Sequence, residues 1–389
     1  MTSPLKSAIR NPQSAIAVFL SVAAILVATL RPTGDELAPG WSFVLTSGDK
    51  AVAEILENII FFIPLGLTLA HGSTRAWRLI AAGTLLSCAV EFAQQWIPGR
   101  DPGLGDIFFN TLGTALGVLL TRTAPRWLTP PAPLPAWLSL GSALAAATIW
   151  LATGFVLRPM LPAPDAIESW TPDLGSHMDL YRGRVLSVTG RLGVAEPLRI
   201  IVDAGRPPGR LAPLLDVDDG PWPAGTLVSV DRSDLVLRNR SRSMYLTLDR
   251  PDLRAYGALA RVAPGDTFTM AAWTDGNGYC LAAGPKQWCG LGYTMGDGWK
   301  LIFYPEHFPP GALRLLNALW IAGWCLGLGW WGRRHAATGV GIAVVALTLL
   351  TGPPLVALLA TPWSEIAGAV GGVAGAWWVR RRYRALSPP

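Results

Sequence analysis

Apolar residues form long, nearly uninterrupted runs in both end regions of the chain, and these runs have the length of membrane-spanning helices. A bilayer core of about 30 Å is crossed by roughly 20 residues of α-helix. The pattern therefore predicts about eight transmembrane helices. The first run ends in Leu30-Arg31-Pro32 without a small-x-small cleavage site, so a retained helix is expected rather than a signal peptide. The runs lie at about residues 14–30, 52–70, 77–97, 104–121, 136–157, 311–331, 337–360 and 363–379.

Residues 158–310 show a different pattern, in which short apolar runs alternate with turn residues. Many short strands without a helical period predict an antiparallel β-sandwich. We therefore expect a polytopic α-helical membrane protein with an inserted all-β domain, divided into residues 1–157, 158–310 and 311–389. The expected strands are VLSV (185–188), LRIIV (198–202), LVSV (227–230), DLVLRN (234–239), MYLTL (244–248), TFTMAAW (267–273) and WKLIFY (299–304), and tight turns are expected at Asp219-Gly220, Asp275-Gly276-Asn277-Gly278 and Asp297-Gly298.

Composition agrees with this class, because 51% of the residues are hydrophobic, only 15% are charged and 18 are Trp. The formal net charge of +6 needs no nucleic-acid partner, because the basic residues are distributed as the positive-inside rule requires. Both termini are therefore predicted to be cytoplasmic, and residues 158–310 extracytoplasmic. The segments assigned to the cytoplasm carry Lys6, Arg10, Arg75, Arg78, Arg122, Arg126, Arg333, Arg334, Arg380, Arg381, Arg382 and Arg384 and no acid, whereas the opposite short loops carry Arg31, Lys50 and Arg100.

The four cysteines divide by compartment. Cys280 and Cys289 lie in the segment predicted to be outside the cytoplasm, where disulfides persist, so we expect them to be bridged. Cys88 and Cys325 fall in apolar runs and are expected to be small core residues. His177 and His307 are the only histidines of the β-rich segment, too few for a zinc site, and neither a metal nor a cofactor is expected.

Polar residues gather near the predicted outer ends of the second, third and fourth helices. At roughly 1.5 Å per residue, Glu91 would lie about 10 Å below Pro98, and Asn110 about 9 Å below Leu104, so the two side chains reach the same depth. Ionisable residues inside a membrane are costly and usually face a partner or a wet cavity. We therefore predict a polar pocket in the outer leaflet. Its candidate residues are Glu54, Glu57, Asn58, Glu91, Gln94, Gln95, Arg100, Asp101, Asp106 and Asn110.

Carboxylates outnumber basic groups in this candidate pocket, because Arg100 is the only basic residue near its mouth and Lys50 is more distant. The carboxylates cannot all be buried and ionised without a cation or raised pKa values. Glu91, the deepest of them, is therefore expected to be protonated or hydrogen-bonded to Asn110 or Gln95.

Arg100 has two interpretations at this stage. Its planar guanidinium suits a carboxylate or a phosphate, so it either clamps the loop through Asp101 or Asp106 or meets an anionic ligand. Structural roles remain the alternative for several candidates. Asp106 is suited to cap a helix. Asn110, with Gly113 and Gly117, is suited to join two helices. Glu54 and Glu57 are suited to be solvated residues of a first helical turn.

Two segments of the chain together resemble the VanZ-like membrane family. NIIFFIPLG (58–66) is followed by EFAQQWIPGRDPGLGDIFFNTLGTALG (91–117), in the family's order and spacing, and the likeness extends over about residues 1–155. The β-rich insertion loosely resembles concanavalin-type sandwich segments. The resemblance implies bacterial cell-envelope biology, since the family's namesake lowers susceptibility to teicoplanin, but it implies no reaction. The family pattern falls on Asn58, Phe62, Pro64, Gly66, Glu91, Gln94, Arg100, Asp106, Asn110 and Gly113.

Three functional hypotheses follow. The first is a non-enzymatic protein of the bacterial inner membrane that binds an envelope lipid, a lipid-linked glycan or a glycopeptide antibiotic, while its outer domain contacts glycan or protein. The second is a membrane enzyme in which Glu91 or Asp106 acts as general base and Arg100 holds phosphate. The third is a proton-coupled transporter with Glu91 as relay. For the β-rich segment, a binding module or spacer is set against a calcium-assisted lectin using Asp216, Asp218 and Asp219.

Overall fold

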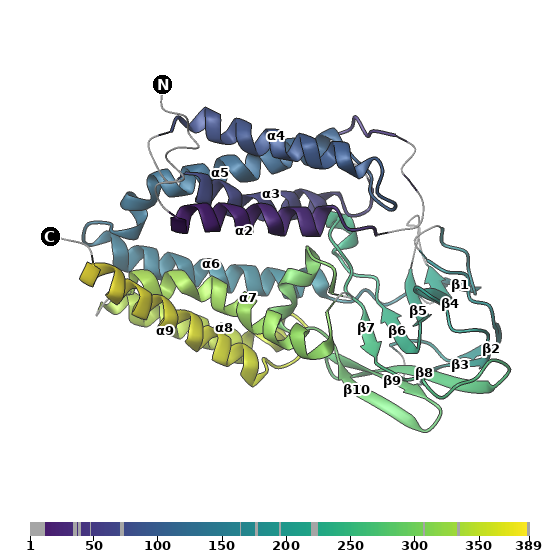
Figure 1. The fold of residues 1–389 in the computed structure, drawn as a ribbon. Coiled ribbons are helices and arrows are strands. Elements are labelled where there is room, and N and C mark those ends of the chain that lie inside the picture. Colours follow the sequence, from purple (N-terminus) through teal and green to yellow (C-terminus); the bar gives the residue numbers. More distant parts are fainter. Residues whose placement is uncertain are drawn as a thin grey trace. The chain divides into compact units, whose positions relative to one another are not determined.

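The computed structural model describes residues 12–33, 37, 40–46, 48–70, 74–163, 165–175, 178–193, 196–218, 225–305, 308–332 and 335–386 (Figure 1). The chain divides into two compact units, Met1–Ala132 and Pro133–Pro389, and each unit is described by itself. Several residues named above lie outside the described part of the chain. They are Lys6, Arg10, His177, Asp219, Gly220, His307, Arg333 and Arg334.

Four helices make up the described core of the first unit. They are α2 (Pro12–Thr29), α3 (Ala51–Leu69), α4 (Ala76–Gln94) and α5 (Leu104–Leu128), and they occupy the first four predicted apolar runs. The closest packing is between α3 and α5, while α4 also lies against α5 and α2 against α3 (Figure 1). Polar groups on α3, α4 and α5 can therefore face one another.

Glycines bring the backbones of α3 and α5 into direct contact. A Cβ atom on Gly113 would overlap the carbonyl oxygen of Ile59, and one on Gly117 would overlap the carbonyl oxygen of Ile63. Small residues allow helices to approach this closely, and the approach is a common device in membrane proteins. The contact fixes the register of the two helices, with the middle of α5 beside the middle of α3.

The second unit contains α6 (Leu134–Leu157), α7 (Pro310–Trp331), α8 (Ala336–Leu355) and α9 (Trp363–Leu386). α6 packs against α7 and α8, and Trp150 of α6 is fully buried in a core that also includes Ile321 and Cys325 of α7. The division between the units therefore differs from the predicted boundary after residue 157, which grouped this helix with the four before it. The reason is that the buried face of α6 packs on α7 and α8, which follow α6 by roughly 150 residues or more in the sequence. Hydropathy does not reveal contacts between helices so far apart in the chain.

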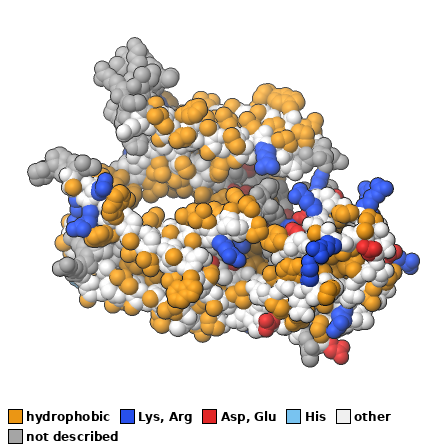
Figure 2. All heavy atoms as spheres, turned by 60° about the horizontal axis from the view of Figure 1, so that its bottom comes forward, with side chains coloured by type: hydrophobic (Ala, Val, Ile, Leu, Met, Phe, Trp, Pro, Cys, Tyr) orange, Lys and Arg blue, Asp and Glu red, His pale blue; other side chains and the backbone are white. Residues whose placement is uncertain are grey.

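Six helices of the described chain, α3 to α8, are long and apolar enough to cross a membrane. Helices also form at the first and last predicted runs, α2 and α9, so all eight runs are helical. Figure 2 shows apolar side chains spread over the helical surface, and many of the charged side chains on the β-rich part. This composition is consistent with a membrane protein.

The β-rich segment forms two antiparallel sheets of five strands each. Their strand orders are β1-β4-β5-β6-β7 and β10-β9-β8-β3-β2. Apolar residues from both sheets, including Ile200 of β3 and Leu235 of β6, line one common interior, so the sheets pack face to face as a sandwich. The strands are β1 (Ile167–Trp170), β2 (Arg184–Thr189), β3 (Leu198–Asp203), β4 (Ala212–Asp218), β5 (Thr226–Asp231), β6 (Asp234–Arg238), β7 (Leu253–Ala255), β8 (Thr267–Asp275), β9 (Gly278–Ala283) and β10 (Lys286–Leu291).

Five of the seven predicted strand runs are strands, and two predictions are wrong. MYLTL contains the short 3₁₀ helix η1 (Met244–Leu246), and WKLIFY overlaps a second one, η2 (Met295–Leu301). η2 begins with a capping box in which Thr294 and Asp297 bond each other's backbone, so Asp297-Gly298 starts a helical turn rather than a hairpin. The expected runs do not include β1, β4, β7, β9 or β10. In β4, Pro213 interrupts the pattern and lies where the register of β4 against β5 shifts.

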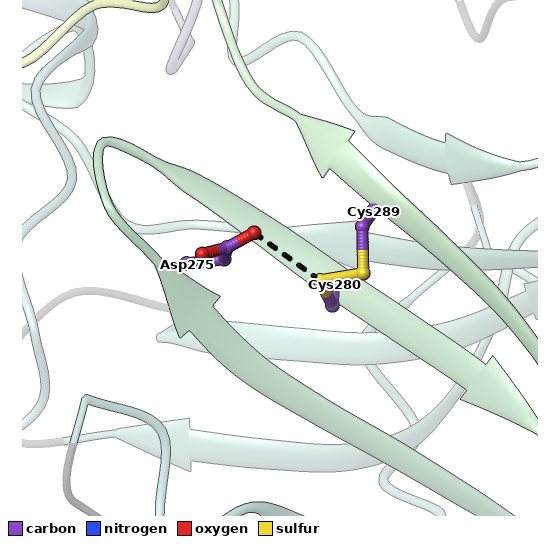
Figure 3. Close-up of side chains that lie close together, drawn as sticks. All are labelled: Asp275, Cys280 and Cys289. Atoms are coloured by element: carbon purple, nitrogen blue, oxygen red, sulfur yellow. Dashed lines mark hydrogen bonds between the residues drawn. A yellow bond between two sulfur atoms is a disulfide. The ribbon is translucent and has the colours of Figure 1, made fainter.

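A disulfide joins Cys280 of β9 to Cys289 of β10, with the Cα atoms 4.1 Å apart, which confirms the predicted pair (Figure 3). β10 is the edge strand of its sheet, so the bond ties this edge to its neighbour. The Oδ2 atom of Asp275 lies 3.9 Å from the Sγ atom of Cys280. Cys88 and Cys325 are free thiols, and Cys325 is fully buried, as expected for a core residue.

Replacing both bridged cysteines by serine is expected to lower the free energy of unfolding of the β-rich region by about 2.5 kcal/mol, the value for closing a short loop. The loop is short because the two residues are 9 apart in sequence. Thermal unfolding in detergent, with and without a reductant, measures the effect. The reductant should lower the Tm of wild type and of Cys88→Ser but not that of the double variant. An unchanged wild-type Tm would show that the bond carries no stability.

Candidate functional site

The candidate polar residues of the first unit meet between α3, α4 and α5. Asn58 of α3 donates a hydrogen bond to Asp106 of α5, with Nδ2 and Oδ1 2.7 Å apart. One turn further along α5, Asn110 donates to Ser87 of α4 over 2.9 Å. These two bonds connect all three helices. We use the name polar cluster for Asn58, Ser87, Glu91, Asp106 and Asn110.

Glu91 is the most deeply buried carboxylate of the polar cluster, with only 2% of its surface exposed. Its Oε2 atom accepts a hydrogen bond from the backbone N–H of Gly103, at 3.0 Å. The predicted partners, Asn110 and Gln95, do not take this role. The reason is that the connection between α4 and α5 folds back over the end of α4, which brings a backbone donor closer than either side-chain amide.

Arg100 binds backbone carbonyl groups rather than a carboxylate. Its Nη2 atom donates to the carbonyl of Ala28 over 2.6 Å and its Nε atom to the carbonyl of Arg31 over 3.0 Å. The last carbonyls of a helix have no partner within the helix and carry partial negative charge, so a cation there is favourable. Of the two interpretations of Arg100, the clamp through Asp101 or Asp106 is therefore wrong, because the end of α2 takes these donors.

Gln94 has a related structural role. Its Nε2 atom donates to the carbonyl of Thr29, at 3.0 Å, at the same end of α2. Gln94 and Arg100 therefore hold α2 against the end of α4. Burial lowers the pKa of Arg100 from its ordinary value, while the nearby carboxylates of Glu91, Glu57 and Asp106 act in the opposite direction. An arginine remains charged in either case.

The segment around Ser42 covers the connection between α4 and α5. Ser42 exchanges backbone hydrogen bonds with Pro102 and Leu104, at 2.9 and 3.0 Å. This fixes the backbone on both sides of Gly103, whose N–H binds Glu91. Neighbouring Phe43 is strongly exposed, with 77% of its surface accessible. The Ser42 segment was not predicted to belong to the site, because its pairing depends on tertiary contacts alone.

The remaining candidates lie around the polar cluster. Glu54 and Asp101 are exposed, and Glu57 and Gln95 are half-buried. Glu54 stands in the first turn of α3, as the solvated interpretation predicts. Glu57 and Glu91 both lie within electrostatic range of Arg100. Glu54, Glu57 and Asp101 add negative charge around the cluster.

Further polar residues extend the cluster deeper between α4 and α5. The hydroxyl groups of Thr84 and Thr111 are 3.0 Å apart, and Thr114 is fully buried. Thr84 stands three residues before Ser87 on the stripe that carries Glu91, so helical spacing could have identified it. Thr111 carries no such signal, because threonine is ordinary in helices of this kind.

Acceptors exceed donors in the polar cluster. Asn110 is 97% buried, and its Oδ1 atom has no hydrogen-bond partner among the described residues. Glu91 and Asp106 each receive one hydrogen bond within the described chain, from Gly103 and Asn58, so each retains a second oxygen as an acceptor. A buried acceptor without a donor costs about 1–3 kcal/mol. The cluster is therefore chemically incomplete.

A second buried polar cluster lies in the second unit and was missed. Glu365, in the first turn of α9, is fully buried and accepts hydrogen bonds from the Thr294 hydroxyl at 2.5 Å and the Gly296 N–H at 3.1 Å. Asn317 of α7 donates to Asp297 over 2.9 Å. The sequence offered one signal for Glu365 and Asn317, because each is a lone polar residue within an apolar run.

This second cluster differs from the first because its carboxylates are well supplied with donors. Asp297 also pairs with Lys300, at 2.5 Å. Burial by itself would raise the pKa of Asp297, but Lys300 and the hydrogen bonds from Thr294 and Asn317 together outweigh it and hold this pKa below the ordinary value. The Trp299 indole N–H donates to Asn317 over 2.8 Å. The arrangement is that of a structural joint between η2, α7 and α9.

The predicted lectin alternative has little support in the described residues. Asp216 is buried within β4, and its Oδ1 atom accepts the Gly225 N–H at 3.0 Å. Asp219 lies outside the described part of the chain. Asp216 therefore holds the β4 to β5 connection.

Fold and site together define a helical domain of the membrane-spanning type with polar groups buried between three of its helices. Residues 12–125 match the family model described as VanZ/LLP1. This part of the chain is therefore a VanZ-like domain. The match ends within α5, whereas the resemblance was expected to extend over about residues 1–155 and so to include the next helix, α6. Neither curated proteins nor solved structures gave a match.

Proposed function

We propose that the chain is an integral protein of the bacterial cytoplasmic membrane whose VanZ-like domain binds an envelope lipid, a lipid-linked glycan or a glycopeptide antibiotic at the polar cluster. A lipid-borne head group is the ligand that the geometry supports best. Glu91 belongs to the last turn of α4, and Asp106 to the first turn of α5. Both carboxylates therefore lie at helix ends, the level at which lipid head groups meet a membrane protein.

The unpartnered Oδ1 atom of Asn110 is the observation that carries this proposal. A side chain that serves only to join helices would be expected to have its buried polar atoms satisfied. Ionisable residues at membrane depth mark functional sites by default, and Glu91 lies one helical turn from Ser87, the partner of Asn110. A bound ligand would supply the missing donor.

The proposed topology places both termini in the cytoplasm and the β-rich segment outside it. The positive-inside distribution supports this, because Arg122 and Arg126 lie in the last two turns of α5 whereas the polar cluster lies near the beginning of that helix. The cluster would then open at the outer leaflet. The disulfide between Cys280 and Cys289 fits an oxidising compartment.

The proposal is tested by measuring the lipids that co-purify with the full chain. Wild type is expected to retain a defined lipid, and Glu91→Gln and Asp106→Asn should each retain at least about tenfold less, as expected when a charged hydrogen-bonding group is removed. Both variants keep an oxygen that can accept the existing bond from Gly103 or Asn58. Quantitative lipid mass spectrometry provides the measurement.

The matched control is Glu168→Gln, which makes the same chemical change at an exposed position of β1. It should retain wild-type lipid. Thermal unfolding of each preparation verifies that the variants are folded. If folded Glu91→Gln and Asp106→Asn retain the same lipids in the same amounts as wild type, the polar cluster is not the binding site.

A further inference from the structure

The polar cluster contains two carboxylates and no basic side chain, and several of its acceptor oxygens receive no donor from the described residues; this imbalance identifies the chemistry of its ligand. The groups with capacity to accept are the second oxygens of Glu91 and Asp106 and the Oδ1 atom of Asn110. Glu91 lies within electrostatic range of both Asp106 and Arg100. Arg100 is the nearby cation, but two of its nitrogens already bind the end of α2.

In the described part of the chain, the polar cluster contains no group of three convergent Asp, Glu, His or Cys side chains that could hold a metal ion. Such an ion needs several oxygen ligands at about 2.0–2.6 Å, so the ligand atoms must converge. Within the described residues, the only three Asp, Glu, His or Cys side chains with ligand atoms within 4.8 Å of one another are Asp275, Cys280 and Cys289. Glu91 and Asp106 belong to no such group among the described residues, and their free oxygens suit a ligand that brings its own N–H bonds.

We infer that the ligand of the polar cluster carries a primary ammonium group, an inference that rests on the proposed function. A primary ammonium has one positive charge and three N–H donors. It would offset the carboxylates of Glu91 and Asp106 and provide a donor on the side of Asn110. A trimethylated ammonium has the same charge but no donor, and a glycerol head group has donors but no positive charge.

Arg100 adds a complementary feature for an amine-bearing phospholipid. Its Nη1 atom makes no hydrogen bond within the described part of the chain, whereas Nε and Nη2 are used. A phosphate near an ammonium group could take this remaining donor, since guanidinium and phosphate pair well. The ammonium group would then lie among the carboxylates, and the phosphate would lie at Arg100. A head group with both charges is a zwitterion.

The inference is tested by titrating the delipidated full chain with three phospholipids of identical acyl chains. We expect phosphatidylethanolamine to bind about tenfold more tightly than phosphatidylcholine or phosphatidylglycerol, as measured by native mass spectrometry. Glu91→Gln and Asp106→Asn should abolish this preference, whereas Glu168→Gln should preserve it. Ethanolamine and tetramethylammonium are added as soluble competitors to distinguish a lipid head group from a free amine.

Each outcome bears on a different claim. Competition by ethanolamine alone at low concentration would identify a free amine as a sufficient ligand, and the lack of such competition would identify the lipid. Cluster-dependent binding without preference for phosphatidylethanolamine, or with preference for phosphatidylglycerol, would overturn the ammonium inference and leave the proposed function standing. If no phospholipid or amine binds in a cluster-dependent way, the ammonium inference fails; the proposed function fails with it if Glu91→Gln and Asp106→Asn also retain the wild-type co-purifying lipids. If Glu91→Gln does not fold, Asp106→Asn gives the same comparison.

Discussion

Replacing Gly117 with valine is expected to destabilise the first unit by about 3 kcal/mol or more, at the upper end of the range for overpacking. A Cβ atom at this position would overlap the carbonyl oxygen of Ile63 and the backbone of Gly66, so the obstacle is main chain rather than a side chain that can rotate away. α3 and α5 would have to separate. Separation would also break the hydrogen bond between Asn58 and Asp106.

The expected result is a lower Tm in detergent together with loss of the co-purifying lipid. Leu119→Val is the matched control, because it introduces the same side chain two residues later on α5 at a position that is 56% exposed. It should leave both measurements near wild type. If Gly117→Val unfolds at the wild-type temperature, the close contact between α3 and α5 does not exist.

Replacing Asp252 with asparagine is expected to cost the β-rich region about 3 kcal/mol at neutral pH, the lower end of the range for breaking a buried ion pair. Arg238 and Arg254 both lose a buried carboxylate, while Arg254 keeps its ion pair with Asp231. Asp252 is almost fully buried and binds Arg238 at 2.6 Å and Arg254 at 3.0 Å. Burial by itself would raise the pKa of Asp252, but the two arginines outweigh it and lower this pKa.

The sign of the pH dependence follows from that lowered pKa. The stabilisation is complete above the unfolded pKa of about 3.9 and is lost as the pH falls through the lower folded value. The difference in Tm between wild type and Asp252→Asn should therefore be constant from neutral pH down to about pH 4 and shrink below it. Asp165→Asn, an exposed change in the same segment, should have no effect. A difference that grows on acidification would contradict this assignment.

Hydropathy predicts much of the architecture because it depends on local composition. All eight apolar runs became helices, and the disulfide follows from two cysteines in one segment. The polar cluster could also be predicted from the sequence, because helical spacing aligns Ser87 with Glu91 on α4 and Asp106 with Asn110 on α5. These inferences need only the period of a helix and its direction.

The hydrogen-bond partners of these residues could not be predicted from the sequence in the same way. Arg100 binds Ala28 and Arg31, more than sixty residues earlier, and no local pattern shows that the end of α2 lies beside this loop. Glu91 binds a backbone N–H, a donor that every residue type except proline offers and that sequence cannot single out. Glu365 was not identified as a candidate, because its burial depends on the placement of η2.

The central claim is that the polar cluster opens at the outer face of the membrane to receive an envelope ligand. Labelling of Asp101→Cys, in a chain that also carries Cys88→Ser and Cys325→Ser, tests it most directly, because Asp101 is exposed in the connection beside Glu91. In intact spheroplasts, a membrane-impermeant maleimide should label this cysteine, whereas one at Arg382 should react only after permeabilisation. Labelling of Asp101→Cys only after permeabilisation would place the cluster on the cytoplasmic side and contradict the claim.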